Sequence, residues 1–128
     1  MSIDWTKVVT PADKFEQARE RKYSEISQAH KEHVAGSVMT SIGFPMQFGI
    51  QDSLMVEGAI KIAQASGAEA IYLTDANDVS HYDIPLADAQ TVLLEMSTAF
   101  AMAHAKKQTL RDRTAEVQTQ SDLDKIYW

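Results

Sequence analysis

Apolar residues recur every three or four positions between residues 85 and 117, which is the longest regular pattern in the chain. This spacing forms one stripe along a helix, and it consists of Ala89, Val92, Leu93, Met96, Ala99, Phe100, Ala103, Leu110 and Val117. It predicts a single long helix from about Pro85 to Val117. The second half, from Lys106 to Arg113, is polar apart from Leu110. We therefore expect that half to leave the globular part and to pack on another helix.

A first helix is predicted over Pro11–Val34, with Thr10 at the N-cap and Asp13 completing a capping box. Its apolar seam is narrow, because the stretch Arg19–Glu25 is strongly charged. A helix with such a seam is better suited to pairing with another helix than to lying across a sheet. The expected mate is the second half of the long helix, either as an antiparallel pair within one chain or as a coiled coil between subunits.

Two β-hairpins are predicted between these helices. In the first, Val38–Ile42 and Met46–Phe48 flank a turn that contains glycine and proline. In the second, Ala70–Thr74 and Val79–Ile84 flank Asp75–Asp78, whose Asp and Asn residues suit turn conformations with positive φ. The second hairpin is the clearest local signal in the chain.

A helix between the hairpins is predicted to start at an N-cap of Asp52 or Ser53 and to end at Ser66-Gly67. Its apolar residues, within Leu54–Ala63, cover more than one face of the helix. Because a helix that is apolar on several faces is usually buried, we expect this one to be central. A short final helix is predicted after Thr119, which suits an N-cap.

These elements predict an α+β fold, in which the two β-hairpins form a small antiparallel sheet packed on the central helix and on the long C-terminal helix. The charged N-terminal helix forms an extension. We expect residues 11–128 to be one domain, with a helical extension made of residues 11–36 and 104–117 and a globular part made of residues 37–103. Residues 1–10 precede this domain and hold one Trp and three aliphatic residues.

Residues 1–10 are either a mobile tail or an anchor that docks on a neighbouring molecule, and we favour the anchor because its apolar side chains are costly to leave in water. The two aromatic residues at the other end of the sequence are either a small satellite cluster or a contact surface. Together with the narrow helical seam, these segments supply the predicted interface residues. They are Trp5, Val8, Val9, Phe15, Tyr23, Ile26, Leu110, Val117, Tyr127 and Trp128.

Composition and charge narrow the class of protein. The chain has 128 residues, of which 45% are hydrophobic, and a formal net charge of −6. An acidic chain without a basic face argues against a nucleic-acid partner. No cysteine is present, so disulfides and thiolate metal sites are excluded. Neither a signal peptide nor an apolar run of transmembrane length is apparent, so we expect a soluble protein made in a cytosol.

Candidate chemical groups are few. His30 and His33 have a spacing that two metal ligands can share on a helix, but no third ligand is visible, so solvated or capping histidines are favoured. The acidic turn at Asp75–Asp78 resembles a calcium loop only in part, because it lacks the central Gly and the terminal Glu. His81 and His104 are the remaining acid–base candidates, which would need Asp83 or Glu95 beside them. We expect no metal, no cofactor and no enzymatic activity, and a small enzyme that uses His81 or His104 is the least favoured alternative.

Several segments carry a resemblance to a known family. The order of charged helix, hairpin, helix and Asn-containing hairpin, followed by Leu86–Gln90 at the start of an alanine-rich helix, is similar to a domain of unknown function in proteins of tailed bacteriophages and prophages. Leu110–Asp112 and Thr119–Ile126 resemble the closing segments of that family. The opening residues Ile3–Thr10 resemble the start of many phage tail proteins.

The resemblance implies a tail-associated protein encoded near tail-fibre genes. The expected function is that of a virion structural protein of the tail or baseplate, an adaptor or attachment protein for tail fibres, present as a homo-oligomer or in several copies. The alternative is a tail-fibre assembly chaperone that the virion does not retain. The implied location is the virion tail after synthesis in the bacterial cytoplasm, and the implied partners are other tail or tail-fibre proteins.

Overall fold

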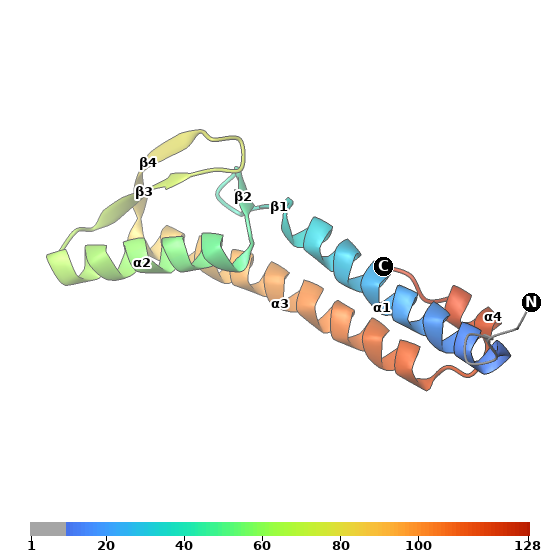
Figure 1. The fold of residues 1–128 in the computed structure, drawn as a ribbon. Coiled ribbons are helices and arrows are strands. Elements are labelled where there is room, and N and C mark those ends of the chain that lie inside the picture. The colour runs from blue at the N-terminus through green and yellow to red at the C-terminus, as the bar shows by residue number, and fades with distance from the viewer. Residues whose placement is uncertain (1–9) are drawn as a thin grey trace, which may run out of the picture. The chain divides into compact units, whose positions relative to one another are not determined.

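A computed structural model of the chain describes residues 10–128 (Figure 1). In this range the helices and strands, in order, are α1 (Pro11–Val34), β1 (Ser37–Met39), β2 (Pro45–Gln47), α2 (Ile50–Ser66), β3 (Ala70–Thr74), β4 (Ser80–Pro85), α3 (Leu86–Glu116) and α4 (Gln120–Asp124). The α+β class is confirmed, as are both hairpins and the long C-terminal helix. The predicted anchor, with Trp5, Val8 and Val9, lies outside the described residues.

The two hairpins form two separate antiparallel sheets of two strands each, β1–β2 and β3–β4, rather than the single sheet that was predicted. One backbone hydrogen bond joins them, from the N–H of Ala76 to the carbonyl oxygen of Pro45, at 2.8 Å. Pro45 has no N–H, and it begins an edge strand, where that loss is tolerated. The strands β1 and β2 are too short to extend a ladder across to the second hairpin.

The structure confirms two of the three predicted N-caps, those of α1 and α4. Thr10 and Asp13 exchange side-chain to backbone hydrogen bonds at 3.1 and 3.2 Å, as a capping box requires. The hydroxyl of Thr119 accepts the N–H of Asp122 and caps α4. The prediction for α2 is wrong, because Gly49 is its N-cap and the Asp52 carboxylate reaches back to the N–H of Gly49.

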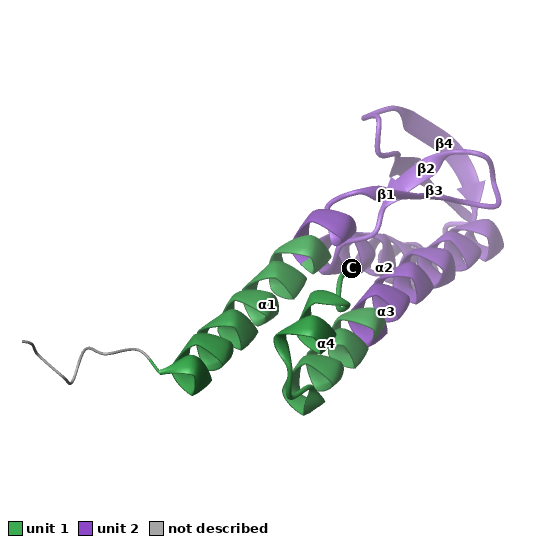
Figure 2. Cartoon of the chain, turned by 90° about the vertical axis from the view of Figure 1, so that its right-hand side faces the viewer, with its two compact units in different colours: residues 1–30, 106–128 green, residues 31–105 purple. Residues whose placement is uncertain are grey.

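The chain divides into two compact units, which are described separately (Figure 2). Unit 1 consists of residues 1–30 and 106–128, and unit 2 of residues 31–105. Unit 2 holds both hairpins, α2 and the first part of α3. Its core is formed by Phe44, Met46, Phe48, Val56, Ile60, Leu73, Ala89, Val92 and Met96.

Unit 1 is an antiparallel pairing of α1 with the last part of α3, closed by α4. Ile26 of α1 packs with Leu110 of α3 and with Ile126, and all three are buried. The guanidinium of Arg19 donates to the carbonyl oxygen of Ala115 at 2.7 Å. Because Arg19 precedes Ile26 in α1 while Ala115 follows Leu110 in α3, the two helices run in opposite directions. The expectation of an antiparallel pair within one chain is therefore met by these residues.

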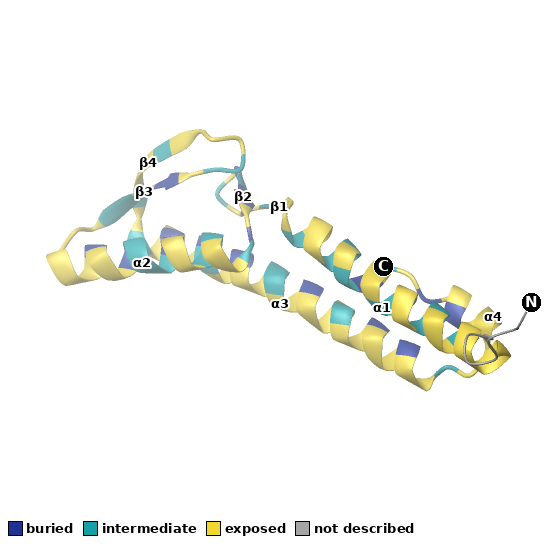
Figure 3. Cartoon of the chain, in the orientation of Figure 1, coloured by how far each residue is buried: buried dark blue, intermediate teal, exposed yellow. Residues whose placement is uncertain are grey.

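Helix α2 is buried on one face only (Figure 3). Val56, Ile60 and Ala63 lie in or beside the core of unit 2. Leu54 and Met55, by contrast, are 54% and 75% exposed. The prediction that α2 is central is therefore wrong for its other apolar faces. A two-stranded hairpin is too narrow to cover more than one side of a helix.

Two glycines of α2 differ in what they do for the fold, and this gives a matched prediction. Gly67 ends the helix with φ 75° and ψ 15°, a left-handed conformation that disfavours a Cβ atom. Gly58 lies within the helix, and an added Cβ would meet nothing within 4 Å. We expect Gly67→Ala to lower the free energy of unfolding by about 1 kcal/mol and Gly58→Ala to raise it by about 0.5–1 kcal/mol.

Urea denaturation followed by circular dichroism measures both changes. The two variants share one helix and one substitution, so each serves as the control for the other. A destabilising Gly58→Ala would show that a neighbouring side chain needs this space. A neutral Gly67→Ala would show that the C-terminus of α2 relaxes without the left-handed residue.

Candidate functional site

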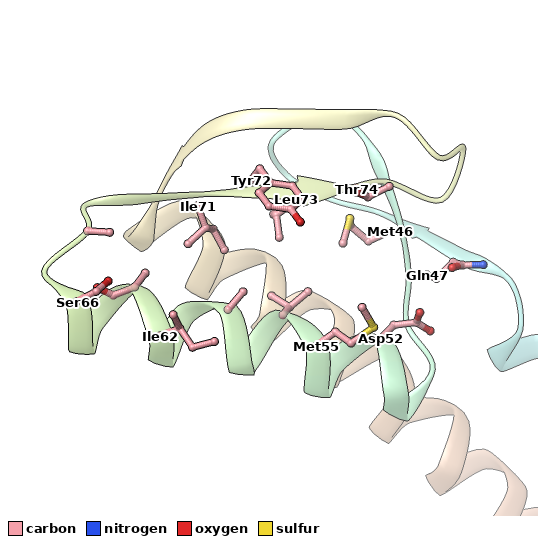
Figure 4. A pocket seen from close by; sticks show the side chains of 14 residues that line it. Met46, Gln47, Asp52, Met55, Ile62, Ser66, Ile71, Tyr72, Leu73 and Thr74 are labelled. Atoms are coloured by element: carbon pink, nitrogen blue, oxygen red, sulfur yellow. The ribbon is translucent and has the colours of Figure 1, made fainter.

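An open, mainly apolar groove lies between α2 and β3 in unit 2 (Figure 4). Its volume is about 470 Å³, and the strand β2 closes one end through Met46 and Gln47. From α2 the groove is lined by Asp52, Met55, Val56, Ala59, Ile62, Ala63 and Ser66, and from the segment leading into and along β3 by Ala68, Ile71, Tyr72, Leu73 and Thr74. The lining is mainly apolar, and it contains one ionisable carboxylate, that of Asp52.

Three of the lining side chains are mostly exposed. Met55 is 75% exposed, Ile62 72% and Tyr72 63%. Large apolar groups of this kind, gathered along one groove, are typical of a binding surface, because leaving them in water is unfavourable. Beneath them, Val56 and Leu73 belong to the buried core, so the floor of the groove is fixed by packing.

The second strand of the groove hairpin is irregular, and this shapes the rim. Ile71 pairs with Ile84 and Leu73 with His81, so two residues of β4 oppose Tyr72. One of these two, Asp83, has φ 57°. The arrangement is a β-bulge, which bends and twists a strand locally. It leaves the rings of Tyr72 and Tyr82 6.0 Å apart on the exposed side of the hairpin.

A carboxylate–imidazole pair closes the turn of the same hairpin. Nε2 of His81 lies 2.8 Å from Oδ2 of Asp75, whose side chain is only 6% exposed. The other carboxylate oxygen accepts the N–H groups of Asn77 and Val79. The His81 ring stacks on Phe44 with 3.8 Å between ring centroids. The hydrogen bond from His81 lowers the pKa of Asp75, against burial, which raises it.

The lowered pKa makes this turn sensitive to acid. The folded state favours the ionised carboxylate of Asp75, so the pair stabilises the fold at pH values above the ordinary carboxyl pKa of about 3.9. This stabilisation is lost as the pH falls through the lower pKa that Asp75 has in the folded state. We expect Asp75→Asn to lower the melting temperature at neutral pH, and the difference from the wild type to shrink below about pH 4.

The control is Asp78→Asn in the same turn. Asp78 has φ 61°, a conformation that Asn tolerates well. We therefore expect Asp78→Asn to change the melting temperature little. Thermal melts between pH 7 and pH 2 give both curves. If the melting temperatures of the wild type and Asp75→Asn differ by the same amount over this whole range, the Asp75–His81 pair does not stabilise the fold as described.

The metal candidates do not form a site in residues 10–128, where no group of three or more His, Asp or Glu side chains is placed to hold an ion. The ring of His30 lies 5.9 Å from that of Trp128 within unit 1. The ring of His33 lies 5.7 Å from that of Phe48 within unit 2. The acidic turn is organised by Asp75 as an ordinary turn, since its carboxylate accepts backbone N–H groups.

Two of the acid–base candidates, His81 and Glu95, are engaged in other contacts. His81 is paired with Asp75 rather than with Asp83. The Glu95 carboxylate accepts the N–H of Ser41 at 2.9 Å and its hydroxyl at 2.6 Å, so it holds the turn between β1 and β2. These contacts are structural, and they leave the apolar groove as the best-formed candidate site.

The predicted interface residues with described positions all belong to unit 1. Ile26 and Leu110 are 2% and 6% exposed, so their apolar surface is used inside the chain rather than presented to a partner. Val117 and Trp128 are partly buried against the same cluster. Tyr127 is 76% exposed. The remaining two are half-buried, with Arg19 over the ring of Phe15 and Arg111 over that of Tyr23.

Sequence reasoning missed the groove residues Met55, Ile62 and Tyr72. A signal was present, because the apolar residues of α2 cover more faces than the helix can bury against two short hairpins. That excess was interpreted as a sign of a central position. The alternative interpretation, an unpartnered face, depends on knowing that the hairpins remain separate.

Comparison with protein-family models, with curated proteins and with solved structures finds no match for this chain. No helix within residues 10–128 is both long enough and apolar enough to cross a bilayer.

Proposed function

We propose that the chain is a structural protein of a bacteriophage tail, an adaptor or attachment protein for tail fibres that acts through protein–protein contacts. The observation that supports a role in protein–protein contacts is the open apolar groove between α2 and β3. A groove that leaves Met55 and Ile62 largely exposed is costly unless a partner covers it. The assignment to a phage tail rests on the resemblance of the helix and hairpin segments to tail-associated proteins.

A structural role rather than an enzymatic one is part of this proposal. The ionisable groups that acid–base chemistry would need are held in turns, as with the Asp75–His81 pair and the Glu95–Ser41 contact. The groove itself offers mainly apolar side chains. Such a lining favours binding of another polypeptide and supplies no nucleophile with an adjacent base.

Mass spectrometry of purified particles from the source phage or induced prophage tests the proposal. We expect the protein in a fixed ratio to the major tail protein, in several copies per particle. Absence from the particle, together with recovery of the protein bound to fibre protein in the lysate, would overturn it in favour of an assembly chaperone.

A further inference from the structure

We propose that the groove between α2 and β3 binds a segment of another polypeptide in which apolar side chains are flanked by lysine or arginine. This inference rests on the proposed function, since it names the chemistry of the partner that the protein contacts. It follows from the lining of the groove and from the distribution of charge between the two units.

The groove has the dimensions of a peptide site. Its lining follows α2 from Asp52 to Ser66, which corresponds to about 20 Å at ~1.5 Å rise per residue. An extended segment of about six residues spans that length. The volume of about 470 Å³ accommodates several apolar side chains, and Met55, Ile62 and Tyr72 are positioned to contact them.

The acidic charge of unit 2 favours basic residues at the two ends of that segment. Unit 2, residues 31–105, has nine Asp and Glu residues against two Lys, a net charge of −7, whereas the rest of the described chain has a net charge of +1. Lys61 of unit 2 is already paired with Glu57 at 2.9 Å. Asp52 lines the groove near β2, and Glu69 is exposed directly before β3. An approaching cationic segment therefore meets an attractive field.

The same charge argues against a dimer in which two copies of the chain pair groove against groove. Pairing groove against groove would bring two units of net charge −7 together, and like charges across an interface are costly. A polypeptide with apolar side chains alone would cover the groove but bring no cation to Asp52 and Glu69. The partner that fits both the lining and these two carboxylates is apolar in its centre and basic at its ends.

Fluorescence anisotropy with two labelled synthetic peptides tests this inference. Both contain alternating Leu and Phe, flanked in one peptide by Lys and in the other by Glu. We expect the Lys-flanked peptide to bind the full-length protein, and the affinity to fall about tenfold as the salt rises from about 0.05 to 0.5 M. Equal binding of the Glu-flanked peptide would overturn the proposal.

Substitutions of groove residues test whether the peptide binds in the groove. Ile62→Lys and Met55→Lys replace exposed groove residues, so we expect both to fold and to weaken binding of the Lys-flanked peptide by about tenfold or more. Leu94→Lys, at a 66% exposed position outside the groove, changes the charge equally and should weaken binding by at most about twofold. Equal weakening by all three would overturn the proposal, as would a dimer of the chain that Ile62→Lys abolishes.

The result is separable from that of the particle analysis. If the protein is present in purified particles and the Lys-flanked peptide does not bind, the groove inference fails and the proposed tail function stands. If the peptide binds as expected and the protein is absent from particles, the groove inference stands and the tail function fails.

Discussion

Replacing Met96 with Ala is expected to lower the free energy of unfolding by about 2–5 kcal/mol. Met96 is fully buried in the core of unit 2, where α3 packs beneath the hairpins and α2. The substitution removes apolar surface and leaves a cavity that the neighbouring side chains fill only in part. Ala is at least as good a helix former as Met, so the loss reports packing rather than helix propensity.

Met102 on the same helix provides the control. It is 69% exposed, so Met102→Ala should change the free energy of unfolding by no more than about 0.5 kcal/mol. Urea denaturation of the two variants and the wild type, followed by circular dichroism, gives the comparison. Similar losses for both variants would show that the stripe on α3 is not oriented as described.

Replacing Ile26 with Asp is expected to unfold unit 1, because it lowers the free energy of unfolding of that unit by at least about 3 kcal/mol. Ile26 is 2% exposed and packs with Leu110 and Ile126, so the new carboxylate would replace apolar surface in a buried apolar cluster. Because unit 2 has its own core, we expect the damage to be local.

Hydrogen exchange measured by mass spectrometry distinguishes local from global loss. Peptides from residues 11–30 and 106–128 should lose protection in Ile26→Asp, while peptides from residues 37–100 retain it. Ile62→Asp makes the same substitution in another helix at a 72% exposed position and should leave both sets protected. Equal loss of protection throughout Ile26→Asp would show that the two units unfold as one.

Much of the fold is predictable because its signals are local. The period of three and four in α3, the capping pair of Thr10 and Asp13, and the Asp-rich turn before β4 each involve residues close together in sequence. The α+β class and the paired helices followed from these. The N-cap of α2 was misplaced because Asp52 suits both the cap and the third helical position, and Gly49 carries no side chain to signal a cap.

The groove was harder to predict because it exists only where no other element covers the apolar face of α2. Its apolar residues are the same whether the helix is covered on all sides or on one, and only the tertiary arrangement decides between them. The Asp75–His81 pair was also missed, although the strands pair regularly beside the turn, with Thr74 opposite Ser80 and Leu73 opposite His81. The contact joins a turn residue to a strand residue that is not directly opposite it, so it depends on the conformation of the turn.

The contacts of Arg19 in α1 bear on the order in which the chain folds during synthesis. Its guanidinium donates to the carbonyl oxygens of Ala115 and Val117, 96 and 98 residues later in the sequence. All of unit 2 is translated between these partners. Unit 2 is therefore synthesised while α1 still lacks the groups that it packs against, and a chaperone that recognises amphipathic helices has its best opportunity to bind α1 in that interval.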